Sequence, residues 1–427
     1  MKCISESITV YPQGQETLSR HMRIIVTVAY ALVVLIGCAP GAPPAAPSLP
    51  AETPALTALP PTPASTEVRE TGESAEEIVQ RLVAAKLAAL QAKDTDAYLA
   101  LLDGSDPEYI TEQRNWFLIH RDAVTADFTI EVKRVEQIDA NTIVATLDQH
   151  YLYGPEKADR RVSYEAKFSL TPAGWKEADL NYRVAATPHF VVKYQDGVEA
   201  KAGEVGEEAE KAYASVVNEL GLAPNGKTTL KLFADQELLR QNTDIRVAYL
   251  FSGWAESNES IKLYARREKE AFARVIAHEL THKITLEITD SLNSWLAEGL
   301  ASYFGSDPFR GENVLHLGRY TAEELARPIS WLEETTLIEL TDEKTIGLYN
   351  AVSSMVMEFM VDTYGLEKIH ALLTELSRYP RYGRGYDYAG MEQENQTRLH
   401  QAIETVLGVK MDTFDQQWLK WLSSQQK

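Results

Sequence analysis

The spacing of apolar residues changes along the 427-residue chain, and this change limits the possible folds more than any other feature. From Ser74 to Leu102, apolar residues recur at helical spacing, which predicts one long and one short helix. From Phe128 to Val184 the period is two, which is typical of strands that bury one face. Beyond Glu268 helical spacing returns. The sequence therefore predicts an α+β protein.

The alternating runs are separated by two turn sequences, Asp139-Ala140-Asn141 and Thr171-Pro172-Ala173-Gly174, so we expect an antiparallel sheet whose last strand runs from Ala178 to Val184. Helices followed by such a sheet, over residues 75–186, resemble the cone-shaped nuclear transport factor two-like fold. We expect an accessory domain here. Its two histidines, His120 and His150, are given no chemistry, because an isolated histidine is most often structural.

A second domain is predicted over residues 187–427, with a small sheet followed by a mostly helical half. Its strands are expected at Phe190–Tyr194, Thr228–Phe233 and Ile261–Tyr264. A helix from Lys201 to Leu220 should end at Gly221. The later helices should stop at Gly305, Pro328, Gly365 and Gly408.

The N-terminal segment has the order of an export signal. Two arginines precede an apolar or small-residue run from Ile24 to Gly37, which is short for a membrane span. The run ends in Leu35-Ile36-Gly37-Cys38, which resembles the lipobox of bacterial lipoprotein precursors. This resemblance implies that residues 1–37 are a signal peptide and that Cys38 is lipidated, so that the protein is anchored to the cell membrane on its extracytoplasmic face. An uncleaved anchor or an ordinary signal peptide is the alternative.

Composition adds three limits. The 62 acidic and 42 basic residues give a net charge of −20, which argues against a nucleic-acid-binding protein. The two cysteines, Cys3 and Cys38, both precede the predicted domains, so no disulfide links the body of the chain. Residues 38–74 are rich in proline and alanine, which predicts a disordered stalk. Met22 is a second candidate start site.

The residues that carry chemistry are found in His278-Glu279-Leu280-Thr281-His282, within a predicted helix. A four-residue step places the two imidazoles about 40° apart on one face, one turn from each other. Both can therefore bind one metal ion. A catalytic zinc ion needs three protein ligands and one open position, so a third ligand must come from elsewhere.

The third ligand is predicted to be Glu298, within Trp295-Leu296-Ala297-Glu298-Gly299-Leu300-Ala301. A break at Thr289-Asp290-Ser291 carries helix-capping residues and lets the chain reverse direction before this segment. Glu279 points about 100° round the helix from His278, beside the ion, where a general base is needed.

These motifs resemble those of the gluzincin metallopeptidases, in particular the thermolysin-like, peptidase MA-like domains. The resemblance implies a zinc ion held by His278, His282 and Glu298, with Glu279 activating water. It also implies a tyrosine that stabilises the oxyanion, at Tyr349, with Tyr303 and Tyr264 as other candidates. The strand Ile261–Tyr264 is a candidate edge for binding an extended peptide.

Two departures limit the resemblance. The segment Gly253-Trp254-Ala255-Glu256-Ser257-Asn258-Glu259 lacks the aminopeptidase pattern, so exopeptidase specificity is unsupported, although Glu256 or Glu259 can still lie near the cleft. Ser302 stands where thermolysin-like enzymes have an aspartate. The sequence predicts a membrane-tethered zinc metallopeptidase acting on a peptide or protein substrate. The alternative is a binding or scaffold lipoprotein that retains the fold with little turnover. The oligomeric state stays open.

Overall fold

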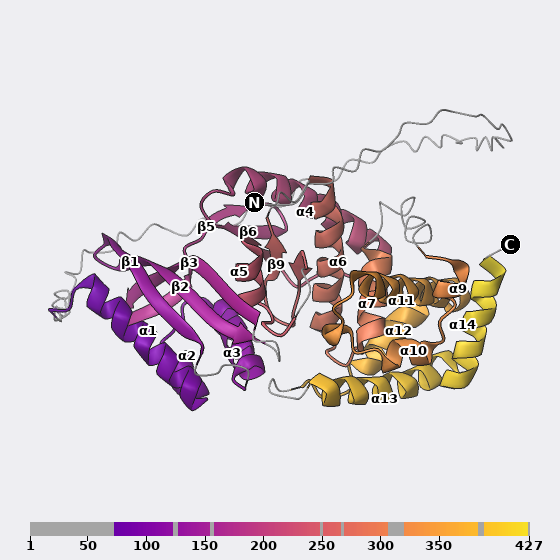
Figure 1. The fold of residues 1–427 in the computed structure, drawn as a ribbon. Helices are drawn as coiled ribbons and strands as arrows, with labels where there is room; N and C mark the ends of the chain where they lie inside the picture. Colours follow the sequence, from indigo (N-terminus) through magenta and orange to yellow (C-terminus); the bar gives the residue numbers. More distant parts are fainter. Residues whose placement is uncertain are drawn as a thin grey trace, which may run out of the picture. The chain divides into compact units, whose positions relative to one another are not determined.

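The computed structural model describes residues 72–122, 127–153, 158–247, 251–265, 269–305, 320–382 and 388–425, within one compact unit. The predicted signal peptide, Cys38 and all but the end of the predicted stalk lie outside these residues. No helix among the described residues has the length and apolar character needed to span a bilayer. The unit contains two sheets and a helical half (Figure 1).

Three helices precede the first sheet. α1 (Ala75–Ala92) begins at a capping box formed by Ser74 and Glu77, and α2 (Thr95–Leu99) is capped by Asp94, so the predicted long and short helices are confirmed. α3 (Pro107–His120) was not predicted from the spacing of apolar residues. Its start is nevertheless marked by Asp106, whose side chain accepts the N–H groups of two residues in the first turn, followed by proline at the first helical position.

The first sheet, sheet A, is antiparallel, as predicted. Its strand order is β1-β2-β3-β4, where the strands are β1 (Thr129–Asp139), β2 (Thr142–Tyr153), β3 (Ala158–Thr171) and β4 (Gly174–Leu180). The alternating residues of β2 and β3 are buried against the helices, and Gly174 adopts a positive φ of 96° in the turn before β4. We call α1 to β4 the first half.

The second sheet, sheet B, has the order β5-β6-β7-β9-β8. Its strands are β5 (Arg183–Ala186), β6 (Phe190–Tyr194), β7 (Thr228–Phe233), β8 (Gly253–Trp254) and β9 (Ile261–Tyr264). The central strands β6, β7 and β9 are parallel, and the outer strands β5 and β8 are antiparallel to their neighbours. We call β5 to the C-terminus the second half.

Two strand predictions were wrong. The alternation from Ala178 to Val184 predicted one strand, but the structure has β4 in sheet A and β5 in sheet B, because the chain leaves one sheet near Asn181 and Tyr182 and enters the other. β9 was predicted as an edge strand, but it lies between β7 and β8, so β8 is the edge of sheet B.

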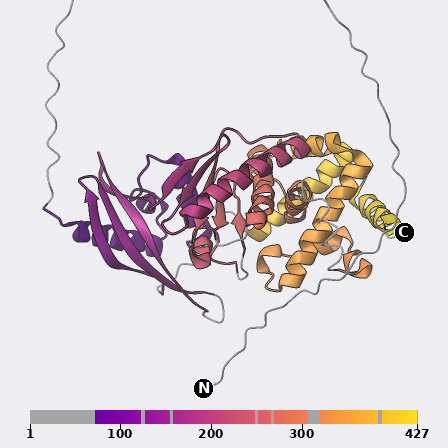
Figure 2. The ribbon, with the colours of Figure 1, turned by 90° about the horizontal axis from the view of Figure 1, so that it is seen from above.

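Helices cover sheet B and form the rest of the second half. They are α4 (Glu199–Leu220), α5 (Gln236–Gln241), α6 (Lys269–Ile288), α7 (Ser294–Phe304), α9 (Ala322–Leu325), α10 (Ile329–Glu334), the 3₁₀ helix η1 (Leu337–Glu339), α11 (Glu343–Tyr364), α12 (Leu366–Leu376), α13 (Tyr388–Leu407) and α14 (Met411–Gln425). The predicted helix ends at Gly221, Gly305, Gly365 and Gly408 are confirmed. Sheet B lies between sheet A and the C-terminal helices (Figure 2). The predicted α+β class is confirmed.

The two halves meet at a row of three lysines on sheet B, two of them buried. The strand register aligns Lys193, Lys231 and Lys262 across β6, β7 and β9. The ammonium groups pair with carboxylates of the first half: Lys193 with Asp106 at 2.7 Å, and Lys231 with Glu112 at 2.6 Å and with Asp179 at 2.5 Å. Lys231 and Lys262 are each only 2% exposed. Because buried charges need partners, this lysine row ties the two halves together.

The lysine row predicts how stability depends on pH. Burial alone would raise the pKa of Glu112, but Lys231 and Lys262 lower the pKa from 4.5 to about 2. The ionised carboxylate therefore stabilises the folded state fully above about pH 4.5, and this contribution is lost as the pH falls toward about 2. We expect the free energy of unfolding, measured with urea, to decrease across this range.

Glu112→Gln is the variant that isolates this contribution. It should be less stable than the parent at neutral pH by about 3 kcal/mol, because Lys231 loses a charged partner. The difference between variant and parent should shrink as the pH falls through the range in which Glu112 titrates. A difference that stays constant down to about pH 2 would contradict the assignment.

Candidate metal centre

Helices α6 and α7 carry the predicted metal ligands. α6 presents His278 and His282 one turn apart, and it ends at Ile288, directly before the predicted break. The residue that caps α7 is Asn293, whose side chain accepts the N–H of Leu296 at 3.2 Å. Thr289 has a different role, because its hydroxyl donates to the carbonyl of Leu376 and accepts the N–H of Ser291. α7 then packs against α6 and brings Glu298 to the histidines.

The structure brings together the three predicted ligands. The Nε2 atoms of His278 and His282 lie 3.1 Å apart. The Glu298 carboxylate places Oε2 at 3.3 Å from Nε2 of His278 and Oε1 at 3.5 Å from Nε2 of His282. In a tetrahedral zinc site with bonds of about 2.05 Å, neighbouring ligand atoms are about 3.3 Å apart. Among the described residues, His278, His282 and Glu298 each offer one donor atom within 4.8 Å of the others, and two imidazoles with one carboxylate are a donor set that suits a zinc ion.

Two glycines permit the close approach of the elements that hold these ligands. A Cβ on Gly305, at the end of α7, would lie 2.7 Å from the backbone nitrogen of His278. A Cβ on Gly299, next to Glu298, would lie 2.7 Å from the carbonyl oxygen of Ser353 on α11. A larger residue at either position would push backbone away, so these glycines fix where α7 sits.

The pKa values of the two glutamates of the site, Glu298 and Glu279, are shifted in opposite directions. Burial alone would raise the pKa of Glu298, but His282 and His278 hold its pKa well below the ordinary value, so its carboxylate is ionised. For Glu279, burial raises the pKa to about 7 and Glu298 adds to the rise, while His278 and a hydrogen bond from the backbone N–H of Ala255 oppose it. Glu279 is thus a buried carboxylate that lies next to the three predicted ligands and is not one of them.

The edge strand β8 lies against Glu279. A Cβ on Gly253 would be 2.6 Å from both Cγ and Oε1 of Glu279 and 2.7 Å from Cγ1 of Val275. Only glycine leaves room for the glutamate here. The backbone of Gly253 and the N–H of Ala255 together therefore define the position of the Glu279 carboxylate.

The ligands and Glu279 line a groove of about 1150 Å³. Its walls come from α3, the 251–259 segment, α6, α7, the 337–350 region, residues 381–382 and residues 391–395. The lining mixes apolar side chains with charged ones, including Trp254, Leu337 and Ile338 beside Glu256 and Arg274. A cavity of this size accommodates several residues of an extended peptide.

The tyrosines proposed from the family resemblance lie elsewhere. Tyr349 is on α11 with its side chain 0% exposed, packed near the ring of Trp331, and the groove-lining residues of that helix are Ile346 and Asn350. Tyr303 and Tyr264 are also absent from the described lining of the groove. The oxyanion role of Tyr349 stays a prediction.

Two groove residues had no signal in the sequence. Tyr382 lines the groove and donates from its hydroxyl to Oδ1 of Asn395 at 2.9 Å, and Asn350 lines it from α11. Both belong to segments far from the metal-binding motif in sequence. The two acidic residues that were expected near the cleft, Glu256 and Glu259, do line it.

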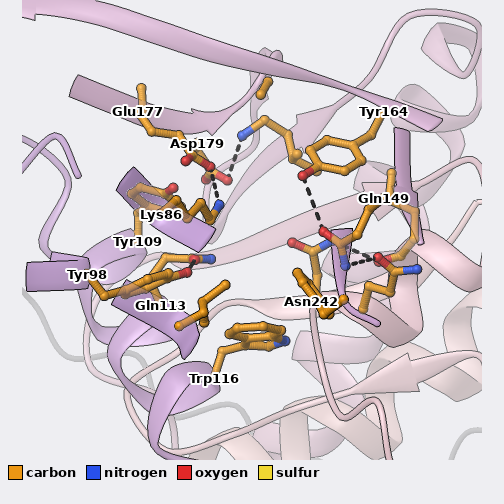
Figure 3. Close-up of a pocket in the computed structure, with 17 residues that line it drawn as sticks. Lys86, Tyr98, Tyr109, Gln113, Trp116, Gln149, Tyr164, Glu177, Asp179 and Asn242 are labelled. Atoms are coloured by element: carbon orange, nitrogen blue, oxygen red, sulfur yellow. Dashed lines mark hydrogen bonds and ion pairs between the residues drawn. The ribbon is translucent and has the colours of Figure 1, made fainter. Parts of the chain in front are cut away.

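A second, smaller cavity lies between sheet A and helices α3 and α5 (Figure 3). Its volume is about 50 Å³, enough for about three water molecules. Several of its polar groups pair with one another, such as Lys86 with Glu177 at 2.6 Å and Tyr98 with Gln113 at 2.5 Å. From the second half, Gln241 of α5 bonds to Gln149 and helps to line the cavity. We therefore assign no substrate site to it.

We compared the chain with protein families, curated proteins and solved structures. No protein-family model matches the chain, and no curated protein matches it. One solved structure with some similarity is a mutant of an M1 zinc metallopeptidase from Deinococcus radiodurans, at 14% sequence identity and a TM-score of 0.33. The match covers 69% of this chain and 62% of that protein, so the chain spans less than two thirds of its length.

Proposed function

We propose that this protein is a zinc-dependent metallopeptidase that hydrolyses peptide bonds. The observation that carries the proposal is that His278, His282 and Glu298 bring three donor side chains close enough to share one zinc ion inside a large groove. A buried carboxylate, Glu279, lies directly beside them. This combination is the one that metal-assisted hydrolysis requires.

The chemistry is divided between the ion and the chain. When bound, zinc supplies Lewis acidity, which polarises a carbonyl group and lowers the pKa of a water molecule to about 7. Glu279 accepts a proton from the attacking water at its carboxylate and delivers it to the nitrogen of the leaving amine. Gly253 and Ala255 keep that carboxylate in place.

The edge of sheet B supports a peptide as substrate. β8 pairs with β9 on one side, through Gly253 and Trp254, and borders the groove on the other. An edge strand can hydrogen-bond an added extended chain. We propose that the substrate lies along β8, with its scissile carbonyl at the metal centre.

The test measures metal and activity together. The full chain should bind about one zinc ion and cleave members of a pooled peptide library, and a chelator should remove cleavage until zinc is restored. Glu298→Ala should lose both zinc and cleavage. Zinc bound without cleavage of any peptide would favour the alternative, a binding or scaffold protein that retains the fold.

Gly253→Ala should separate metal binding from turnover. The added methyl group would overlap the side chain of Glu279, so we expect kcat to fall by about 100-fold because the general base is displaced. Zinc affinity should change by less than about threefold, since the atoms nearest to the added methyl group belong to Glu279 and Val275, which are not metal ligands. Kinetics on a cleaved peptide and a zinc titration check both values. Unchanged kcat would show that Glu279 is not the base or is not constrained by β8.

Membrane attachment is a separate proposal that rests on the sequence alone. We propose that Cys38 carries a lipid and tethers the protein to the extracytoplasmic face of the membrane. In bacterial cells fed a labelled fatty acid, the parent should become labelled and remain with the membrane fraction. Cys38→Ser should lose the label. A labelled Cys38→Ser variant would rule out Cys38 as the anchor.

A further inference from the structure

Helix α3 of the first half contacts the segment that follows the edge strand β8. Glu112 accepts the backbone N–H of Ser260 at 3.0 Å and also accepts the hydroxyl of Ser260. Asn115, one turn further along α3, donates from Nδ2 to Oε1 of Glu259 at 2.6 Å. These contacts join residues more than 140 positions apart in the sequence.

Glu259 is also held from the second half. Lys262 of β9 donates to Oε2 of Glu259 at 2.7 Å. Lys283, which directly follows the metal ligand His282 on α6, donates to the backbone carbonyl of Glu259 at 2.7 Å. Glu259 and Ser260 are both buried. The end of the segment is therefore fixed between α3 and α6.

The other end of the segment, at Gly253 and Ala255, contacts the side chain of Glu279. β8 forms only two residue pairs with β9, Gly253 with Leu263 and Trp254 with Lys262. Ala255, the next residue, donates its N–H to the Glu279 carboxylate. Between Ala255 and Glu259 the chain turns tightly, with Asn258 at a φ of 60°. So short a strand is weakly held by its own pairing, and the contacts at Glu259 and Ser260 limit where it can lie.

We propose that Glu112 and Asn115 are positioning residues for the active site: they hold the 253–260 segment so that β8 faces the groove and Ala255 meets Glu279. The first half then contributes to the geometry of the catalytic site and is more than an accessory domain. The catalytic consequence rests on the proposed function, whereas the positioning itself does not.

Asn115→Leu is the main test, because leucine fills similar space and cannot donate to Glu259. Glu112→Gln is the second variant, because it removes the charge that faces Lys231 and Lys262. The matched control is Lys193→Gln. It breaks an ion pair with Asp106 in the same lysine row, and the ion pairs of Lys193 among the described residues are with Asp106 and Asp179, both outside residues 253–260.

Two readouts are measured on the full chain. Hydrogen exchange of peptides covering residues 253–260 should become about tenfold faster in Asn115→Leu and Glu112→Gln, and should stay near the parent rate in Lys193→Gln. With zinc bound, kcat on a cleaved peptide should fall about tenfold in the two test variants, with little change in KM. A purely structural role would lower the melting temperature of all three variants and leave kcat per folded molecule unchanged.

The outcomes are separable. Unchanged exchange of residues 253–260 in a folded test variant overturns the positioning. If Asn115→Leu does not fold, Asn115→Ala removes the same donor without adding a large apolar side chain. Hydrogen exchange of residues 253–260 in Asn115→Ala then tests the positioning. If the parent cleaves no peptide, the proposed function fails, while the exchange comparison still supports or overturns the positioning by α3.

Discussion

Replacing Glu279 by glutamine is expected to lower kcat by about 10²- to 10⁴-fold while zinc stays bound. The amide has the size of the carboxylate, and its oxygen can still accept the N–H of Ala255, so the side chain keeps its place. It cannot accept a proton from water. His278, His282 and Glu298 are unchanged, so zinc stoichiometry should equal that of the parent.

A control on the same helix guards against a general effect of removing a carboxylate. Glu287, near the C-terminal end of α6, accepts the N–H of Asn225 and is absent from the described lining of the groove. Glu287→Gln should therefore keep the parent kcat. The experiment compares initial rates on one cleaved peptide at matched zinc content. Cleavage by Glu279→Gln at the parent rate would remove Glu279 as the general base.

The metal site was predictable because most of its geometry is local. A four-residue step on a helix places His278 and His282 on one face whatever surrounds them. The break after α6 was visible in the sequence, and Glu298 needed only a short return of the chain to reach the histidines. The capping residue was assigned to the wrong positions, because Thr289 and Ser291 have the same capping chemistry as Asn293.

The strand order around the site was not predictable, because it depends on contacts between distant segments. β8 has two residues, too few to show any alternation, and it occupies the edge that β9 was expected to form. α3 shows weak periodicity, and its start is marked by local capping chemistry alone. Its contacts with Glu259 and Ser260 depend on how the two halves pack, which no local pattern encodes.

The environment of Tyr349 shows the same limit. Its place near the start of a late helix was read correctly, since α11 begins at Glu343. Which face of that helix meets the groove depends on its packing against α7 and α10, and this packing directs Tyr349 into the core while Asn350 faces the groove. Sequence spacing alone cannot choose between adjacent faces of a buried helix.

Gly305→Ala is expected to weaken both the fold and the metal site. The new Cβ would lie 2.5 Å from the carbonyl oxygen of Ala301 and 2.8 Å from Cα of His278. These are backbone atoms, so α7 must move relative to α6. We expect a loss of about 1–3 kcal/mol in the free energy of unfolding, measured without zinc. Zinc affinity should fall by about 10- to 100-fold, because His278 and Glu298 no longer converge.

Gly203→Ala on α4 is the matched control for this glycine. A Cβ at Gly203 meets no atom within 4 Å, so alanine should leave zinc affinity unchanged. It should also stabilise the fold by about 0.5–1 kcal/mol, because alanine favours a helix over glycine. Zinc affinity is measured by competition with a chromophoric chelator. Parent-like affinity in Gly305→Ala would mean that the ligands tolerate movement of α7, and the close contact between α7 and His278 would then have no role in holding the metal.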